Sequence, residues 1–190
     1  MCGKIYCGIK HQCRQAAFHG AKQVKERTHS IVAAVFLILI SFQVISSIGY
    51  HSATVEEGVH LAAGVSYLKR LDFSAFSGYP PAGRMMLGIW PALAGASAPD
   101  DPEVYREMYP FSYGSRFLYE LNDADRILFK ARMTVALLSA LLGFFVFRLT
   151  SKLAGATCGL IALFFYTFCP NILAHSGLAT LDLPLSAFFF

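Results

Sequence analysis

A stretch of twenty residues without a charge, residues 31–50, constrains this chain more than any other feature of its sequence. As a helix rising ~1.5 Å per residue it is about 30 Å long, which is the thickness of the hydrocarbon core of a bilayer. Only 15% of the chain's residues are charged, whereas a soluble domain carries about 25%. The sequence therefore predicts an integral membrane protein whose first transmembrane helix covers residues 31–50.

The segment before this span, residues 1–30, is basic. Its six Lys and Arg residues are accompanied by a single acid, Glu26. Such charge could contact nucleic acid, but beside an apolar span it is typical of a cytoplasmic flank that faces anionic lipid. We therefore predict a multi-pass protein of the cell (inner) membrane, with a cytoplasmic N-terminus, the lipid bilayer as a partner and no nucleic acid.

A polar region, residues 51–132, follows the first span. It carries eight Lys or Arg and ten Asp or Glu residues, so it is too polar and too long to cross the bilayer. We predict a large extracytoplasmic first loop that contains amphipathic, interfacial helices. Its tyrosines and tryptophan fit an aromatic belt at the membrane interface, namely Tyr67, Tyr79, Trp90, Tyr105, Tyr109 and Tyr113.

The second apolar run, residues 133–148, is short for a span. Either the arginines that flank it reach out to the interface, or its helix starts earlier in the chain. The following segment, 149–152, is basic without an acid, as cytoplasmic links commonly are. We therefore predict a second transmembrane helix that returns to the cytoplasm.

A third transmembrane helix is predicted over residues 153–170, where a proline ends or bends it. Residues 171–182 then form an extracytoplasmic loop, and residues 183–190 start a fourth span. Eight residues are too few to cross a bilayer. The sequence therefore predicts the N-terminal part of a longer all-α polytopic protein.

Counting the crossings places three carboxylates near helix ends at the same face of the membrane. Glu56 and Glu57 follow the first span, and Asp182 follows the third. Carboxylates near membrane depth are costly and are often functional. Coupling sites of transporters, by contrast, lie deep within the spans, where this sequence has no charge. A cation site in a transporter is therefore a weaker alternative.

Each carboxylate also has a purely structural interpretation. Thr54 and Glu57 have the spacing of a capping box, in which the glutamate accepts from the threonine N–H. His60 shares a helix face with both glutamates, and the Glu57–His60 spacing also occurs in metal sites. Asp182 lies two residues before a proline, as helix-capping residues often do. The residues alone leave capping and catalysis open.

Several segments resemble the GT-C membrane glycosyltransferases, in the order that this family has them. The stretch "TVEEGVHLAAGVSYLKRLDFSAFSGYPPAGRMMLGIWPAL" resembles the family's first outer loop, and "YGSRFLYELNDADRILFKARM" and "CPNILAHSGLATLDLPLSAFFF" resemble later segments. The resemblance covers about residues 30 to 190. It is similar in particular to bacterial phospholipid-carrier-dependent transferases, such as protein O-mannosyltransferases and the lipid A aminoarabinose transferase. It implies the N-terminal part of a GT-C-type helical bundle.

The resemblance also implies roles for individual residues. Glu56 falls on the family's active-site aspartate, which activates the acceptor, and Glu57 falls on the glutamate beside it. Asp182 falls on a second acidic position of the same cavity, and Arg84 falls near a basic position that contacts the donor phosphate. The chain departs from the family pattern by having Glu56 in place of aspartate, and Tyr79 where histidine is common.

The expected function is inverting glycosyl transfer, at the extracytoplasmic membrane face, from a polyprenyl-phosphate-linked sugar to an acceptor hydroxyl on a protein, lipid or glycan. As a fragment of such a transferase, the chain is expected to be inactive alone. Glu56 and Asp182 are the expected catalytic residues, while Glu57, His60 and Arg84 are expected to bind substrate. A divalent cation could serve as cofactor, although the sequence indicates no ligand set for it. The alternative is a non-catalytic membrane protein, a truncated remnant or an assembly subunit, in which the acids only cap helices.

Overall fold

Apolar stretches interrupted by glycine, proline and polar turns give this chain a succession of helices. The structure is a computed structural model, and it describes residues 26–71, 73, 79–99 and 110–189. Most of the predicted basic arm therefore lies outside the described residues. The helices are an N-terminal helix Glu26–Ile48, α2 Val55–Arg70, α3 Pro81–Leu93, α5 Pro110–Tyr119, α6 Ala124–Ala154, α7 Ala156–Phe168, α8 Pro170–Ser176 and α9 Asp182–Phe189. The described residues contain no strand, which confirms the all-α prediction.

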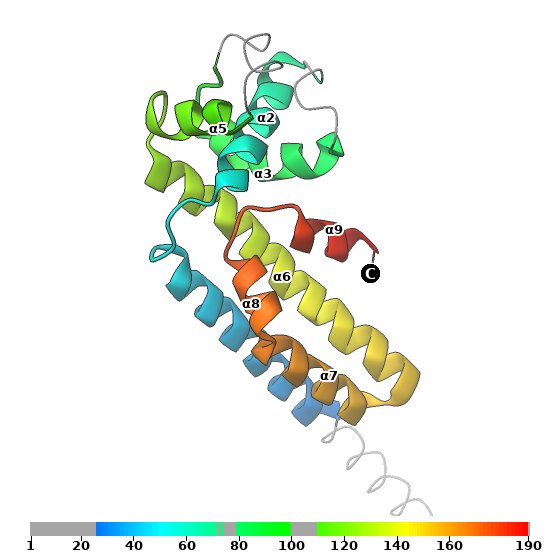
Figure 1. Ribbon diagram of the computed structural model, residues 1–190. Helices are drawn as coiled ribbons and strands as arrows, with labels where there is room; N and C mark the ends of the chain where they lie inside the picture. The colour runs from blue at the N-terminus through cyan, green and yellow to red at the C-terminus, as the bar shows by residue number, and fades with distance from the viewer. Residues whose placement is uncertain (1–25, 72, 74–78, 100–109, 190) are drawn as a thin grey trace, which may run out of the picture.

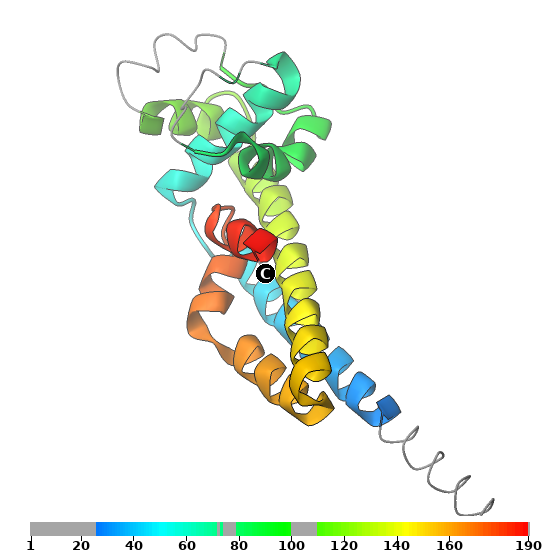
Figure 2. The same cartoon turned by 90° about the vertical axis from the view of Figure 1, so that its right-hand side faces the viewer.

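The helices form two regions along α6. The short helices α2, α3 and α5, here called the helical cap, gather around the first turns of α6 (Figures 1 and 2). The N-terminal helix, α7 and α8 lie along the remaining length of α6, and α9 lies beside its middle. The chain thus places its polar region at one end and its apolar helices at the other.

Within the described residues, two helices are long and apolar enough to cross a membrane. They are the N-terminal helix, with 23 residues, and α6, with 31 residues. The α7–α8 pair makes a third crossing if it is one span, but it is bent by 62° at its break. The helix lengths and composition therefore fit a membrane protein with transmembrane helices.

The second predicted span, residues 133–148, is part of a longer helix. Because α6 begins at Ala124, the earlier helix start supplies the missing length. The segment predicted as a link, 149–152, is helical as well. It contains no helix breaker, so α6 ends only before Gly155, whose φ of 93° an L side chain rarely adopts. The turn into α7 is therefore shorter than the predicted link.

The third predicted span, 153–170, is also divided differently. Cys169 is extended, with φ −71° and ψ 118°, because a residue before proline avoids the helical region. Pro170 then starts α8, which occupies part of the predicted loop 171–182. The proline thus bends the chain, which is one of the two outcomes expected of it.

Two glycines set the close packing of the helical cap. A Cβ built on Gly64 of α2 would lie 2.0 Å from the Arg84 carbonyl oxygen, and one on Gly88 of α3 would lie 2.6 Å from the Gly64 carbonyl carbon. Any side chain there would force α2 and α3 apart. This packing holds the buried face of α2 against the first turns of α3, where the candidate site lies.

Candidate functional site

Glu57 is the most enclosed acid of the candidate site, with none of its surface exposed. Its Oε1 accepts from Arg132 Nε at 2.8 Å and from the Ala179 N–H at 2.7 Å. Its Oε2 accepts from Arg132 Nη2 at 2.8 Å, the Thr54 N–H at 2.9 Å and the Thr54 hydroxyl at 3.1 Å. Five donors thus occupy the carboxylate, and the predicted capping contact to Thr54 is present.

Burial alone would raise the pKa of the Glu57 carboxyl. The hydrogen bonds from Arg132 and from the Thr54 and Ala179 N–H groups, together with the charge of Arg132, hold that pKa below its usual value. All these contacts favour the ionised form. Glu57 is therefore a carboxylate at neutral pH, and its oxygens are already used within the protein.

Arg132 completes this buried ion pair. Besides the two bonds to Glu57, its Nη1 donates to the carbonyls of Ile48 and His51, and its Nη2 donates to that of Ser52. A guanidinium has five N–H groups, and all five are used. Arg132 therefore joins α6 to the end of the N-terminal helix, to the connection after it and to α2.

A second buried charge, Arg84, comes from α3 and contacts residues of α2 that follow Glu57. Arg84 is 1% exposed. Its Nε donates to His60 Nδ1 at 3.3 Å, and its Nη1 donates to the Tyr67 hydroxyl at 3.0 Å. The Tyr79 ring stacks against it, with its centroid 4.8 Å from the guanidinium carbon. Arg84 is thus enclosed by side chains of the protein.

His60 is neutral at physiological pH. Burial, followed by the positive charge of Arg84, lowers its pKa to about 4, while the negative charge of Asp182 opposes this shift. Because Nδ1 accepts the hydrogen bond from Arg84, the single proton of the imidazole is on Nε2. His60 can therefore donate one hydrogen bond from Nε2.

Asp182 is the first residue of α9 and reaches this group from the far end of the chain. Its Oδ2 lies 3.2 Å from His175 Nδ1, and the two side chains are 65% and 47% exposed. The residue before it, Leu181, contacts the first turn of α3, since a Cβ on Gly83 would lie 2.9 Å from Leu181 Cδ2. Asp182 therefore lies beside the start of α3 and remains open to a ligand.

Glu56 differs from its neighbour Glu57 in its exposure and in its contacts. It is exposed in the first turn of α2, and its side chain makes no hydrogen bond or ion pair with another described residue. On a helix it lies one turn from His60. Glu56 is therefore an accessible carboxylate at the edge of the buried group.

The five residues singled out in the sequence thus fall into two classes. Glu57, His60 and Arg84 are buried, whereas Glu56 and Asp182 are accessible. The ring of partners around them adds Arg132, Tyr67, Tyr79 and His175. Of the predicted aromatic belt, Tyr67 and Tyr113 are 1% exposed, so they belong to the interior of the cap.

Arg132 was the residue that the sequence did not single out. It stands at the edge of an apolar run, where an arginine commonly reaches out to the interface. The signal available was that Arg132, just before the second apolar run, and Glu57, just after the first, lie at the same membrane face when the crossings are counted. Opposite charges that are buried or lie at the membrane edge tend to form an ion pair, because an unpaired charge there is costly in free energy.

The described residues contain no group of three or more His, Cys, Asp or Glu side chains that could hold a metal ion. No protein-family model, curated protein or solved structure matches the chain.

Proposed function

We propose that this protein transfers a sugar from a polyprenyl-phosphate carrier to an acceptor hydroxyl, at the membrane face that bears the helical cap. The observation that carries the proposal is the accessible carboxylate of Asp182 near the buried His60 and Arg84, with the exposed Glu56 one helical turn before His60. The chain segments that form it are joined by the hydrogen bond from the Ala179 N–H, in the segment before α9, to Glu57 of α2, which spans 122 positions. The order of GT-C-like segments in the sequence supports the same activity.

In the proposed reaction the acceptor oxygen bonds to the anomeric carbon as the bond from that carbon to the phosphate oxygen breaks. The Glu56 carboxylate takes the proton of the acceptor hydroxyl as general base. The bonding electrons leave with the polyprenyl phosphate. Attack from the side opposite the phosphate inverts the anomeric configuration.

The buried residues would act on the leaving phosphate through charge and one donor. Arg84 is enclosed, so we assign it the positive potential beneath the phosphate rather than a direct contact. The Nε2–H of His60 is the group that would donate to a phosphate or sugar oxygen. Asp182, fixed by His175, would orient the acceptor or a divalent cation that the donor brings.

The proposed orientation follows from the same scheme. The helical cap would face the outside of the cell (inner) membrane, with the N-terminus in the cytoplasm, as the basic residues before the first span favour. The donor would then enter from the outer leaflet. The acceptor, whether protein, lipid or glycan, would reach the carboxylates from the aqueous side.

One observation favours the non-catalytic alternative for part of the site. All five donors on Glu57 come from the protein itself, as they would in a helix-capping and structural role. We therefore take Glu57 out of the substrate-binding set and keep it as a structural residue. The alternative extends this role to Glu56 and Asp182.

Reconstitution in liposomes tests the proposal. The protein is incubated with radiolabelled polyprenyl-phosphate mannose, glucose or aminoarabinose, and release of the label from the carrier lipid is followed. We expect release from at least one donor, and loss of that release in Glu56→Gln without loss of folding. Turnover of no donor by folded wild-type protein would favour the non-catalytic alternative.

A further inference from the structure

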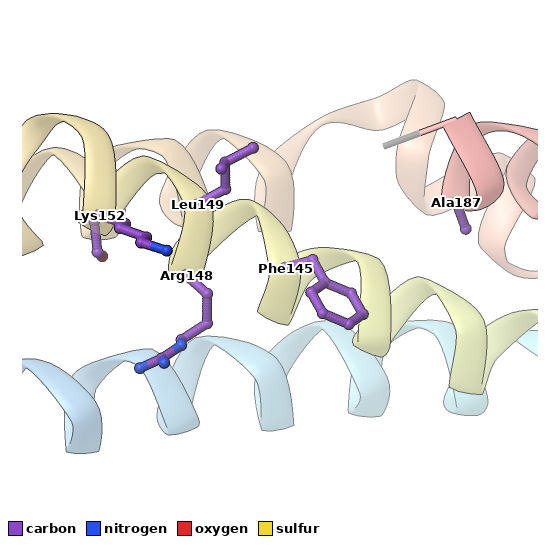
Figure 3. A pocket seen from close by; sticks show the side chains of 6 residues that line it. Phe145, Arg148, Leu149, Lys152 and Ala187 are labelled. Atoms are coloured by element: carbon purple, nitrogen blue, oxygen red, sulfur yellow. The ribbon is translucent and has the colours of Figure 1, made fainter.

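A cavity lies near the C-terminal end of α6, away from the helical cap. Its volume is about 710 Å³. Figure 3 shows its labelled side chains along successive turns of α6, with one residue of α9 beyond them. The lining residues are Phe145, Arg148, Leu149, Ser151, Lys152 and Ala187. None of them belongs to the candidate site described above.

Two cations line this cavity without a counter-charge. Arg148 and Lys152 are four residues apart on α6 and thus lie on the same side of the helix. Neither side chain forms a hydrogen bond or ion pair with a described residue. The chain has no Asp or Glu between Asp125 and Asp182. The cavity is therefore positively charged at this end, and a ligand anion would be the partner of both cations.

A hydroxyl group lies between these cations in the sequence. The Oγ of Ser151 is buried and has no hydrogen-bond partner among the described residues. A buried polar group normally has one. Ser151 lines the cavity, but this oxygen lies against α7, where a Cβ on Gly159 would be 2.0 Å from it. The two cations, and not the hydroxyl, are therefore the groups open to a ligand.

The other end of the cavity is apolar. Phe145 is 50% exposed, and Ala187 lies beyond it in Figure 3, whereas Leu149, which is also apolar, stands between the two cations in the sequence. From Phe145 to Lys152 the helix rises about 10 Å. The lining thus changes from hydrocarbon to positive charge over the distance from the first acyl carbons to the headgroup of a lipid.

We propose that this cavity binds an anionic phospholipid of the bilayer. Arg148 and Lys152 hold the phosphate of the headgroup, and one acyl chain lies along Phe145 toward Ala187. A soluble phosphate would use only the charged end and would leave the apolar end exposed to water. The location on a helix long enough to span a membrane favours a lipid. This site is independent of the proposed glycosyl transfer.

Native mass spectrometry of the full chain in detergent tests the proposal. The chain is titrated with phosphatidylglycerol and with phosphatidylcholine of the same acyl chains. Two cations near one headgroup predict roughly tenfold or more preference for phosphatidylglycerol. The variant Arg148→Gln/Lys152→Gln should lose this preference, whereas Ser151→Ala, which removes a hydroxyl buried against α7, should keep it.

The matched control is Arg126→Gln/Lys130→Gln. It removes the same charge, at the same spacing, from the cap end of the same helix, and should leave the preference intact. Circular dichroism shows that each variant is folded. An equal loss in both double variants would mean general attraction to positive protein and would overturn the site. The site would also be overturned if the wild-type chain showed no preference for phosphatidylglycerol. The same holds if glycerol phosphate at equal concentration displaced the bound phosphatidylglycerol.

Discussion

Glu57 of α2 and Arg132 of α6 form a buried, bidentate ion pair, with 2.8 Å between each pair of donor and acceptor atoms. Seventy-five positions separate them in the chain. Glu57 also accepts from the Ala179 N–H, and Arg132 also donates to the carbonyls of Ile48, which ends the N-terminal helix, and of His51 after it. It therefore connects the cap, α6, the N-terminal helix and the segment before α9 at one point.

Breaking this pair should destabilise the protein strongly. In Glu57→Gln or Arg132→Met the remaining partner is left as a buried, uncompensated group, which costs about 3–5 kcal/mol. The free energy of unfolding, measured by denaturant titration in detergent, checks this. The control is Glu120→Gln, whose ion pair with Arg116 is 67% and 48% exposed and should contribute less than about 1 kcal/mol. Equal effects of Glu57→Gln and Glu120→Gln would contradict the structural role of the pair.

Adding a methyl group at Gly64 should separate α2 from α3. Its Cβ would meet the backbone of Arg84 at 2.0 Å, and backbone cannot move aside as a flexible side chain can. We expect Gly64→Ala to cost at least about 1–3 kcal/mol, as overpacking does. In Gly49→Ala the new Cβ has no atom within 4 Å, so this variant serves as the control. A neutral Gly64→Ala would show that the two helices do not pack this closely.

The free energy of unfolding should decrease as the pH is lowered, because His60 is buried in its neutral form. Its folded-state pKa is about 4, against 6.5 for the unconstrained group, so protonation favours the unfolded chain. The contribution of the neutral imidazole is complete above pH 6.5 and is lost progressively as the pH falls to 4, by about 3 kcal/mol in total.

Unfolding free energies measured at several pH values check this, with His60→Gln as comparison. The lowered pKa of Glu57 has its effect only below its usual value of 4.5, where the carboxylate starts to be protonated. The window between pH 6.5 and 4.5 therefore reports on His60. If the wild type and His60→Gln lose stability equally in this window, the imidazole is not buried beside Arg84.

Asp182 should matter for turnover and little for folding. Its contact with His175 is largely exposed, and exposed ion pairs contribute about 0–1 kcal/mol. Asp182→Asn should therefore keep its unfolding midpoint while glycosyl transfer falls by about 100-fold or more, the range of a lost general acid–base or orienting group. A variant that transfers sugar at the wild-type rate would remove Asp182 from the mechanism.

Patterns that act over a few residues were readable in the sequence. The uncharged stretch predicted the N-terminal helix, the Thr54–Glu57 spacing predicted the capping contact, and the proline at 170 predicted a bend or an end. These features depend on backbone geometry close to the residue concerned. The all-helical character follows from them.

The division of roles within the acidic pair was not readable in this way. Which of two adjacent glutamates faces inward depends on the partner that α6 supplies, Arg132, and on the backbone that the segment before α9 brings to Glu57. Likewise, the enclosure of Arg84 depends on the close approach of two glycines in different helices. Such contacts are set by tertiary packing, which no local spacing encodes.

We propose that Glu56 acts in the reaction, while Glu57 stabilises the fold. The most direct test measures the unfolding midpoint and the rate of release from the carrier lipid in the same preparations of Glu56→Gln and Glu57→Gln. We expect Glu56→Gln to keep its midpoint and lose transfer, and Glu57→Gln to lose stability while transfer per folded molecule persists. A Glu56→Gln variant that transfers sugar normally, or a Glu57→Gln variant as stable as the wild type, would contradict the account.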